Sequence, residues 1–512
     1  MDRPINKWIV ALVVIIPTLL EVIDTSVVNV ALDHIRGSLS ATVDEATWAI
    51  TSYLVSNAII IPLTGWLARV FGRKRYLLFS IVLFTVSSFL CGMAWSLPAL
   101  IFFRVLQGLG GGALQPMSQT ILLETFPPRE HGKAMAVFGI GVIFAPIIGP
   151  ILGGWITDNW SWNWIFYINI PIGILSIIMV SLVIKDPPYL KRVSLSRIDY
   201  RGLMLISVGL GLLQVVLDRG QQDDWFNSGH IVLMAVISLI SLLAFVFVEL
   251  RSKEPVVNLR VFRNKSFAVG NSIMFVTFFV LFATIVILPL FLQRLMGYNA
   301  LWAGYVIAPG GLAVLVAMPI VGKLASRVSP KLLLIIGLLL NAYSTWYLTS
   351  LNLNIDFDFL LVSRIFMGVG MACVFINLTM LTLSSVPKEE MGNATGIYNL
   401  LRNLGGSFGV AFVTTILARR TQFHHSRLVE QMNPYDPAFQ HAVSRVTALP
   451  QLQGAPAPGA AEAVIFQESV RQANLFAFVD VFFICTVALL CIVPFVAMLR
   501  RPKHAAMPVA AH

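Results

Sequence analysis

Two acidic residues and an arginine lie within long apolar stretches of the sequence, where charge is rare. Glu21 and Asp24 are three residues apart, so a helix would present both carboxylates on one face, and Arg104 lies in a later apolar stretch. An ionised side chain at the centre of a bilayer costs about 2.5–3.5 kcal/mol on translocon scales, so such residues often mark ion pathways. A guanidinium partner favours an ionised carboxylate, and its loss in a dry setting favours the protonated form. These residues could therefore bind and release a proton.

The depth of these residues predicts a charge pair. Asp24 and Arg104 each lie about six residues, or about 9 Å, below the expected outer end of their stretch. Two other interpretations stay open, because an arginine near a boundary can extend to water and an aspartate near a helix end can cap a backbone. Arg364 has the same depth without an acid nearby, so we expect it to pack or to line a cavity, and we interpret Arg402 as structural.

The composition excludes a soluble protein. Hydrophobic residues make up 57% of the 512 residues, charged residues only 12%, and the mean hydropathy is +0.80. A soluble domain carries about 25% charged residues. The four cysteines lie in apolar runs without metal-ligand spacing, and no phosphate-binding loop or nucleophile–base pattern occurs. We therefore expect no metal, no cofactor and no enzymatic activity, and an ion gradient as the source of energy.

Fourteen apolar runs have the length of about 20 residues that a helix needs to cross a bilayer. They lie near 8–30, 46–69, 77–95, 98–121, 133–156, 164–184, 200–217, 230–249, 267–292, 300–322, 331–350, 358–384, 395–418 and 475–499. The sequence predicts an all-α integral membrane protein with fourteen transmembrane helices.

The basic residues predict the orientation of these helices. With both termini cytoplasmic, 25 of the 36 Lys and Arg residues fall in cytoplasmic segments, whereas Arg36, Arg219 and Arg294 alone fall in short outer loops. This asymmetry explains the net charge of +11 as an orientation signal, so nucleic-acid binding is not expected.

Three local patterns recur at an offset of about 260 residues. One of them is Arg104-x-x-x-Gly108-x-Gly110, which matches Arg364-x-x-x-Gly368-x-Gly370. This offset carries each matched span onto the span eight places later. Because eight is even, the two matched spans cross the membrane in the same direction, so the two halves have the same orientation. We predict a six-helix bundle over 1–190, an inserted helix pair over 191–265 and a second six-helix bundle over 266–512. Parallel halves are typical of transporters that work by alternating access.

Further residues are candidates by type and spacing. Polar side chains inside the spans are predicted to line a substrate cavity: Asn29, Gln107, Gln115 and Arg364. Small residues and prolines in the fifth span favour a close helix crossing, either sliding or static: Gly141, Ala145, Pro146, Gly149, Pro150, Gly153 and Gly154. A turn with orienting charge follows the second span: Gly65, Gly72, Arg73 and Lys74.

The segment 419–474 is the one sizeable polar stretch that we expect outside the membrane. It contains a predicted helix near 461–473 and the adjacent residues His424 and His425, which cannot face one way on a helix. Metal binding is therefore not expected there. A segment of this length suggests either a lid or a docking surface for a partner.

Several motifs resemble the major facilitator superfamily, specifically its fourteen-helix drug:proton antiporters. The resemblance rests on the runs Ile23–Leu32, Arg104–Gly110, Ala145–Gly154 and Trp162–Gly173. It implies proton-coupled export of amphipathic drugs or toxic compounds, with Asp24, Arg104 and Glu21 in coupling. The run His424–Pro434 resembles EmrB-type exporters, which implies a bacterial inner-membrane pump that works with a periplasmic adaptor of the EmrA kind and an outer-membrane channel of the TolC kind.

Two alternatives stay open. The protein could export one natural compound, such as a fatty acid or a siderophore, or it could be a passive facilitator or uptake carrier. Three arginines against two acids within the spans favour an anionic or neutral substrate over a cationic one.

Overall fold

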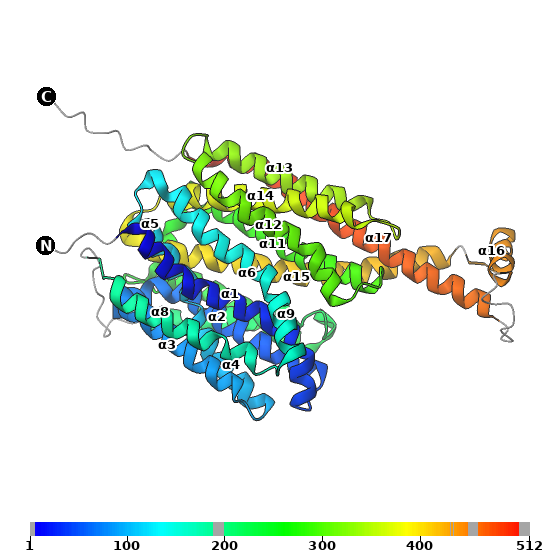
Figure 1. Ribbon diagram of the computed structural model, residues 1–512, viewed down its shortest axis with the longest axis horizontal. Coiled ribbons are helices and arrows are strands. Elements are labelled where there is room, and N and C mark those ends of the chain that lie inside the picture. The colour runs from blue at the N-terminus through cyan, green and yellow to red at the C-terminus, as the bar shows by residue number, and fades with distance from the viewer. Residues whose placement is uncertain (1–5, 188–198, 431, 434, 449–458, 501–512) are drawn as a thin grey trace.

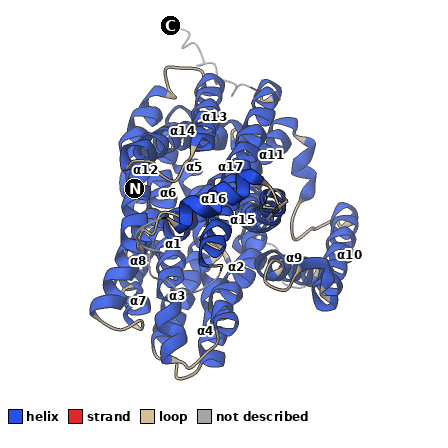
Figure 2. Ribbon diagram, turned by 90° about the vertical axis from the view of Figure 1, so that its right-hand side faces the viewer, coloured by secondary structure: helices blue, strands red, loops and turns tan. Residues whose placement is uncertain are grey.

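Long helices that run from one end of the molecule to the other make up this protein (Figure 1). The computed structural model describes all residues except 1–5, 188–198, 431, 434, 449–458 and 501–512. Within the described residues every regular element is a helix (Figure 2), as the composition predicts.

The helices of the first half are α1 (Lys7–Ser38), α2 (Val43–Phe71), α3 (Arg73–Gly92), α4 (Leu97–Gly111), α5 (Leu114–Thr125), α6 (His131–Asn159), α7 (Trp164–Tyr167) and α8 (Asn169–Val183). Two helices follow, α9 (Tyr200–Arg219) and α10 (Gly229–Arg251). The second half contains α11 (Lys265–Arg294), α12 (Ala300–Leu324), α13 (Pro330–Tyr347), α14 (Phe357–Leu383), α15 (Met391–Val429), α16 (Pro437–Thr447) and α17 (Ala460–Ile492).

The predicted spans are confirmed as helices. Thirteen helices of the described chain are long and apolar enough to cross a membrane, and α6, with 29 residues, takes the place of the predicted fifth span. The fourth span is broken into α4 and α5 after a run of glycines that ends at Gly112. Glycine is a weak helix former, and here it brings the chain so close to α2 that a methyl group at Gly112 would lie 2.8 Å from the Asn57 carbonyl oxygen.

The two halves repeat the same packing, as the sequence repeat predicts. In the first half α1 packs on α6, α2 on α4, and α3 on α4 and α8; in the second half α11 packs on α15, α12 on α14, and α13 on α14 and α17. Each pair maps onto its counterpart by the predicted shift of eight spans. Helices α9 and α10 pack on each other, and α9 also contacts α2 and α15, one helix of each half.

Local signals set the ends of the helices. Thr42 and Glu45 form a capping box that starts α2, since each accepts a hydrogen bond from the other's backbone N–H. Gly72 lies in the turn between α2 and α3 with a φ of +87°, a backbone conformation that residues with a side chain rarely adopt. Lys7 at the start of α1 pairs with Glu130 before α6, and this hydrogen bond holds the pKa of the Glu130 carboxyl below its usual value.

The polar segment 419–474 is largely helical rather than a loop. Helix α15 continues to Val429 and α17 already begins at Ala460, so both helices project beyond the bundle and carry α16 near their tips (Figure 1). We call the part formed by the described residues of 419–448 and 459–474 the stalk. Arg420 and His424 of α15 both bind Asp480 of α17 at 2.6 Å, which joins the two helices at the base of the stalk.

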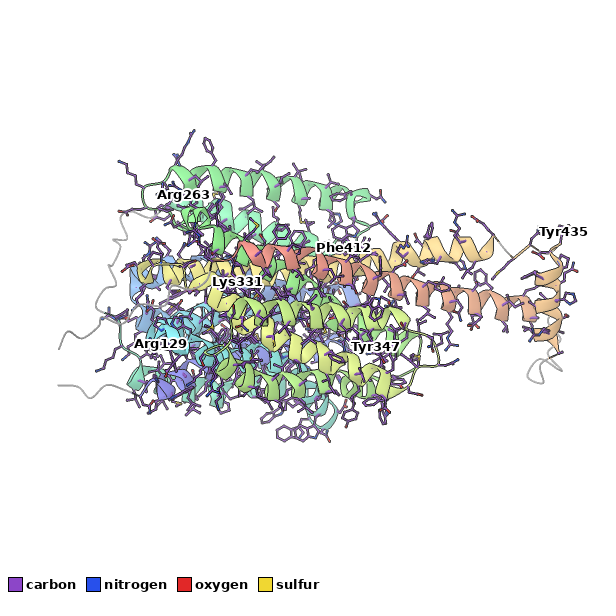
Figure 3. All side chains as sticks on the ribbon, turned by 90° about the horizontal axis from the view of Figure 1, so that it is seen from above. Arg129, Arg263, Lys331, Tyr347, Phe412 and Tyr435 are labelled. Atoms are coloured by element: carbon purple, nitrogen blue, oxygen red, sulfur yellow. The ribbon has the colours of Figure 1, made fainter. Side chains whose placement is uncertain are left out.

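Basic loops and the stalk lie at opposite ends of the molecule. Arg129 and Arg263 lie at one end, and Tyr347 and Tyr435 lie toward the other (Figure 3). The helix α1 begins at the same end as Arg129, since Lys7 at its start pairs with Glu130, the neighbour of Arg129 in the sequence. We call this the basic end.

The halves meet closely at the basic end. A methyl group at Gly65 of α2 would lie 2.5 Å from the backbone nitrogen of Asn393 in α15, and one at Gly132 of α6 would lie 3.1 Å from the Gly322 carbonyl oxygen in α12. Thr120 and Thr395 share a hydrogen bond of 2.6 Å across the same boundary. Small residues thus close the molecule at this end.

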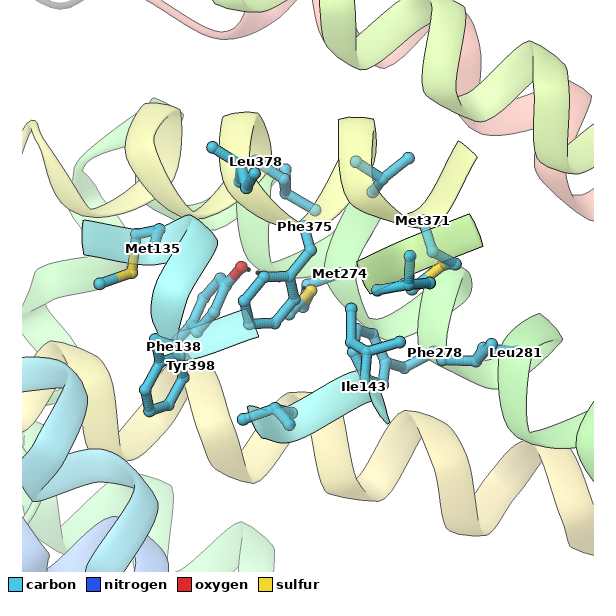
Figure 4. Packing of buried hydrophobic residues seen from close by; sticks show 14 of the residues in the cluster. Met135, Phe138, Ile143, Met274, Phe278, Leu281, Met371, Phe375, Leu378 and Tyr398 are labelled. Atoms are coloured by element: carbon cyan, nitrogen blue, oxygen red, sulfur yellow. Dashed lines mark hydrogen bonds between the residues drawn. The ribbon is translucent and has the colours of Figure 1, made fainter. Parts of the chain in front are cut away.

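Deeper in the protein an apolar cluster continues the boundary between the halves. Phe138 of α6 stacks on Phe375 of α14 with 6.2 Å between the ring centres. Met274, Met371 and Tyr398 lie around these rings (Figure 4). Methionine adapts its shape easily, so such a boundary can repack when the halves move.

A methyl group at Gly65 should force α2 and α15 apart. We expect Gly65→Ala to destabilise this closed arrangement by about 1–3 kcal/mol, the usual effect of overpacking. Spin labels on cysteines at Arg129 and Arg327, which are exposed at the basic end, would then show a larger share of long distances in a pulsed electron paramagnetic resonance measurement.

The control is Gly304→Ala, since no atom lies within 4 Å of a methyl group there. Equal distance distributions in both variants would contradict the assignment of Gly65 to a closing contact.

Candidate functional site

Asp24 and Arg104 form the ion pair that their depth predicts. Both side chains are fully buried, and Nη1 of Arg104 donates to Oδ2 of Asp24 at 2.6 Å. Helix α1 continues to Ser38, eight residues beyond the predicted end, so the pair lies deeper in the protein than the sequence suggests. Neither side chain reaches the surface. Arg104 therefore does not extend to water, and Asp24 does not cap a helix.

Amide side chains complete the surroundings of Asp24. Its Oδ1 accepts hydrogen bonds from Gln107 at 2.9 Å and from Asn169 at 2.7 Å. The Arg104 Nε donates to the carbonyl of Ala49 at 2.9 Å, and its guanidinium lies 4.2 Å from the ring centre of Tyr53. A buried pair needs such added hydrogen bonds because desolvation of both charges opposes it. A proton can therefore reach Asp24 only if these contacts open.

Glu21 lies at the centre of a second polar cluster, which joins the two halves. Its carboxylate accepts from Asn57 of α2 at 3.1 Å and from the amide of Gln115 of α5. The oxygen of the same Gln115 amide accepts a hydrogen bond from Arg402 of α15. Glu21 is 5% exposed and Arg402 is 3% exposed. One glutamine thus connects an acid of the first half to a cation of the second.

The structure gives Arg402 and Gln115 partners that the sequence does not predict. Arg402, which we interpret from the sequence as structural, contacts Gln115 across the boundary between the halves. Gln115 and Gln107, predicted as cavity-lining residues, are engaged with the two acids. An arginine in an apolar span is a detectable signal, but its partner belongs to the other half, and sequence spacing does not reveal contacts between halves.

The glycines of α6 pack against α1 next to Asp24. A methyl group at Gly149 would lie 2.3 Å from the Ser26 hydroxyl oxygen, and one at Gly153 would lie 3.0 Å from a methyl carbon of Val27. The Ser26 hydroxyl donates to the Pro146 carbonyl at 3.0 Å. The predicted close crossing is therefore present, and α6 is one unbroken helix despite its prolines.

The remaining residues of this motif contribute less. Ala145 is buried, and methyl groups at Gly141 and Gly154 would make only ordinary contacts, with Leu19 and Val30. The side chain of Pro150 lies outside the described residues.

The turn after α2 has a packing role beyond orientation. Arg73 pairs with Glu124 at the end of α5. The Lys74 ammonium donates to the Ser181 carbonyl of α8 at 2.6 Å. These contacts tie α3 to the ends of two other helices, so the basic turn fixes the basic end of the first half.

Two further cavity candidates differ in burial. Asn29 is exposed, whereas Arg364 of α14 is 3% exposed. Among the described residues no group of three or more His, Cys, Asp or Glu side chains could hold a metal ion. His424 instead binds Asp480, and His425 lies against the ring of Phe466.

Removing Arg104 alone should leave a buried, unpaired carboxylate. We expect Arg104→Met to destabilise the protein by about 3–5 kcal/mol, and Asp24→Asn in the same chain to restore part of this loss. Thermal unfolding of both single variants and the double variant in lipid nanodiscs measures the coupling. Losses that simply add would show that the two side chains do not stabilise each other.

Comparisons with known proteins agree with this architecture. The model of the Major Facilitator Superfamily matches residues 14–410. The "Multidrug export protein EmrB" of Haemophilus influenzae is 40% identical over 424 residues, 83% of this chain and 83% of that protein. The "Fatty acid resistance protein FarB" of Neisseria gonorrhoeae is 35% identical over 487 residues, 95% of this chain and 94% of that protein.

A solved structure shows the same fold. The human organic anion transporter MFSD10 superposes with a TM-score of 0.61 at 14% identity, covering 95% of this chain and 100% of that one. Together with the parallel halves and the match over most of the sequence, this confirms the resemblance seen in the motifs: the chain is a multi-pass membrane transporter that belongs to the Major Facilitator Superfamily.

Proposed function

We propose that this transporter exports amphipathic drugs or toxic compounds in exchange for protons. The observation that carries this proposal is the pair of buried carboxylates on α1, each held by partners on other helices. The relatives named as multidrug export and fatty acid resistance proteins support export as the direction of transport. We expect the substrate to leave chemically unchanged and the proton gradient to drive the cycle without a cofactor.

Coupling follows from what separation of the halves does to Glu21. The contacts at Gly65, Gly132 and Thr120 close the basic end, so this conformation excludes substrate from that side. When the halves part there, Arg402 moves away from Gln115 and Glu21 loses its cationic neighbour. A carboxylate without such a neighbour in a dry site favours its protonated form. Opening of the molecule at the basic end therefore favours proton binding at Glu21.

Asp24 provides a second coupling residue within the first half. Its three hydrogen bonds come from α4 and α8, so its protonation depends on how these helices sit against α1. The close crossing of α6 on α1 next to Asp24 transmits motion at the boundary to this site.

The basic end indicates how the protein is oriented in the membrane, and the stalk at the opposite end indicates where a partner binds. By the positive-inside rule the basic end faces the cytoplasm, so both termini are cytoplasmic and the stalk is periplasmic in a bacterial inner membrane. Apolar residues are exposed at the tip of the stalk, and they surround a groove of about 640 Å³: Val429, Val464 and Phe466. Exposed apolar surface outside the membrane marks a partner site. We propose that a periplasmic adaptor of the EmrA kind binds this groove and leads to a channel of the TolC kind.

A second candidate function is export of one natural fatty acid. It is favoured by the fatty acid resistance relative, which matches 95% of this chain. A transporter of this kind would show one good substrate and little response to a panel of drugs.

Proton exchange can be measured directly. With purified protein in liposomes and an imposed pH gradient, amphipathic compounds should trigger a change of luminal pH in the wild type. Asp24→Asn should abolish it, because an amide of nearly the same size cannot bind and release a proton in this pH range. The control is Asp33→Asn, which removes an exposed acid from the same helix.

Each other outcome has a defined meaning. A proton signal that survives Asp24→Asn and disappears in Glu21→Gln would assign coupling to Glu21 alone. Compounds that cross without any proton movement would refute exchange and establish a passive facilitator.

The stalk should bind the adaptor without serving proton exchange. We expect Phe466→Asp to weaken binding of a purified EmrA-type adaptor by at least about tenfold, since a charge would enter an apolar groove. Biolayer interferometry measures the binding, with Ser444→Ala on the polar part of α16 as control. Unchanged binding, or loss of proton exchange in liposomes, would contradict a docking role.

A further inference from the structure

Arg364 is a buried cation that no described side chain neutralises. The residue is 3% exposed, its Nε has no hydrogen-bond partner, and its Nη2 approaches only the Ser363 hydroxyl, at 3.4 Å. That hydroxyl already bonds to Ser344 of α13 at 3.0 Å, so it is a weak partner. Arg364 lies in the eighth position of α14, well inside the helix.

The other two arginines inside the spans differ in this respect. Arg104 pairs directly with Asp24, and Arg402 reaches Glu21 through Gln115. Both acids are thereby balanced, and one positive charge is left over at Arg364. An uncompensated buried charge is strongly unfavourable, so a protein that keeps one has a use for an anion at that place.

The side chains that follow Arg364 on its face of α14 are apolar and buried. Met367 and Met371 follow at three and seven residues, on the same face of α14. Met367 contacts Thr284 of α11, and Met371 lies in the apolar cluster with Phe278 (Figure 4). We call Met367, Met371 and Phe278 the apolar strip. It extends about 10 Å along the helix from the guanidinium.

We propose that Arg364 binds the anionic head of an amphipathic substrate, whose apolar tail lies along the apolar strip. This inference rests on the proposed export function and names a substrate class for it. A guanidinium suits a carboxylate or sulfonate because its planar fork donates two parallel hydrogen bonds. Methionine side chains adapt to tails of different shape, so the strip accepts a class of compounds rather than one.

The experiment compares two probes that share a tail and differ in the sign of the head. Octanesulfonate is permanently anionic and octyltrimethylammonium is permanently cationic. Calorimetric titration of the full chain in lipid nanodiscs measures binding of each, with empty nanodiscs subtracted. Arg364→Met should weaken octanesulfonate binding by about tenfold to a hundredfold, the range for a lost charged hydrogen bond. Octyltrimethylammonium should not lose affinity in this variant, because a buried positive charge that repels its head is removed.

Two further variants keep the result specific. Arg364→Lys keeps the charge without the fork and should lie between wild type and Arg364→Met. Arg294→Met removes an exposed arginine from the same half and should leave both affinities unchanged. Equal losses for both probes in Arg364→Met would assign Arg364 to helix packing and overturn the inference.

The outcome also separates this inference from the proposed function. A wild type that exchanges protons for octyltrimethylammonium but does not bind octanesulfonate would uphold proton-driven export and overturn the anion site. A wild type that binds octanesulfonate without any proton exchange would uphold the anion site and refute the exchange. Failure to bind octanesulfonate and octyltrimethylammonium alike would overturn the anion site, whereas the export function is tested separately by the luminal pH signal with the panel of amphipathic compounds.

Discussion

The arrangement of this transporter depends on how charges are neutralised away from water. Asp24 and Glu21 sit on one helix, yet they are balanced in different ways. Asp24 has its cation within the same half, so its neutralisation is independent of how the halves are placed. Glu21 has its cation in the other half, through one amide. The same physical requirement thus gives one acid a partner in its own half and the other a partner in the opposite half.

Close helix contacts make the second kind of neutralisation possible. Gln115 reaches Arg402 only because α5 and α15 approach each other near Thr120 and Thr395, and because Gly65 lets α2 rest on the backbone of α15. Bulkier residues at these places would separate the halves and leave Glu21 without its cation. The contact between Glu21 and its cation deeper in the protein therefore depends on the close packing at the basic end.

The sequence predicts contacts that depend on depth and helix direction. The Asp24–Arg104 pair follows from two positions at similar depth on helices of opposite direction, and the repeat predicts how the halves are built. The partner of Arg402 cannot be predicted this way, because it depends on how two rigid bundles meet. The predicted helix near 461–473 is present as the first part of α17, but the polar residues after 418 give no sign that α15 continues to Val429, because polarity does not exclude a helix. The glycine run before Gly112 could have signalled the break between α4 and α5.

The long helix α15 connects the boundary between the halves to the tip of the stalk. Arg402 at the boundary between the halves and Val429 in the stalk lie on one unbroken helix, about 40 Å apart. Since a rigid rod turns as a unit, a tilt of about 10° at Arg402 moves the tip by about 7 Å. In the proposed cycle, a motion of α15 that takes Arg402 away from Gln115 would also displace the tip of the stalk and anything bound there.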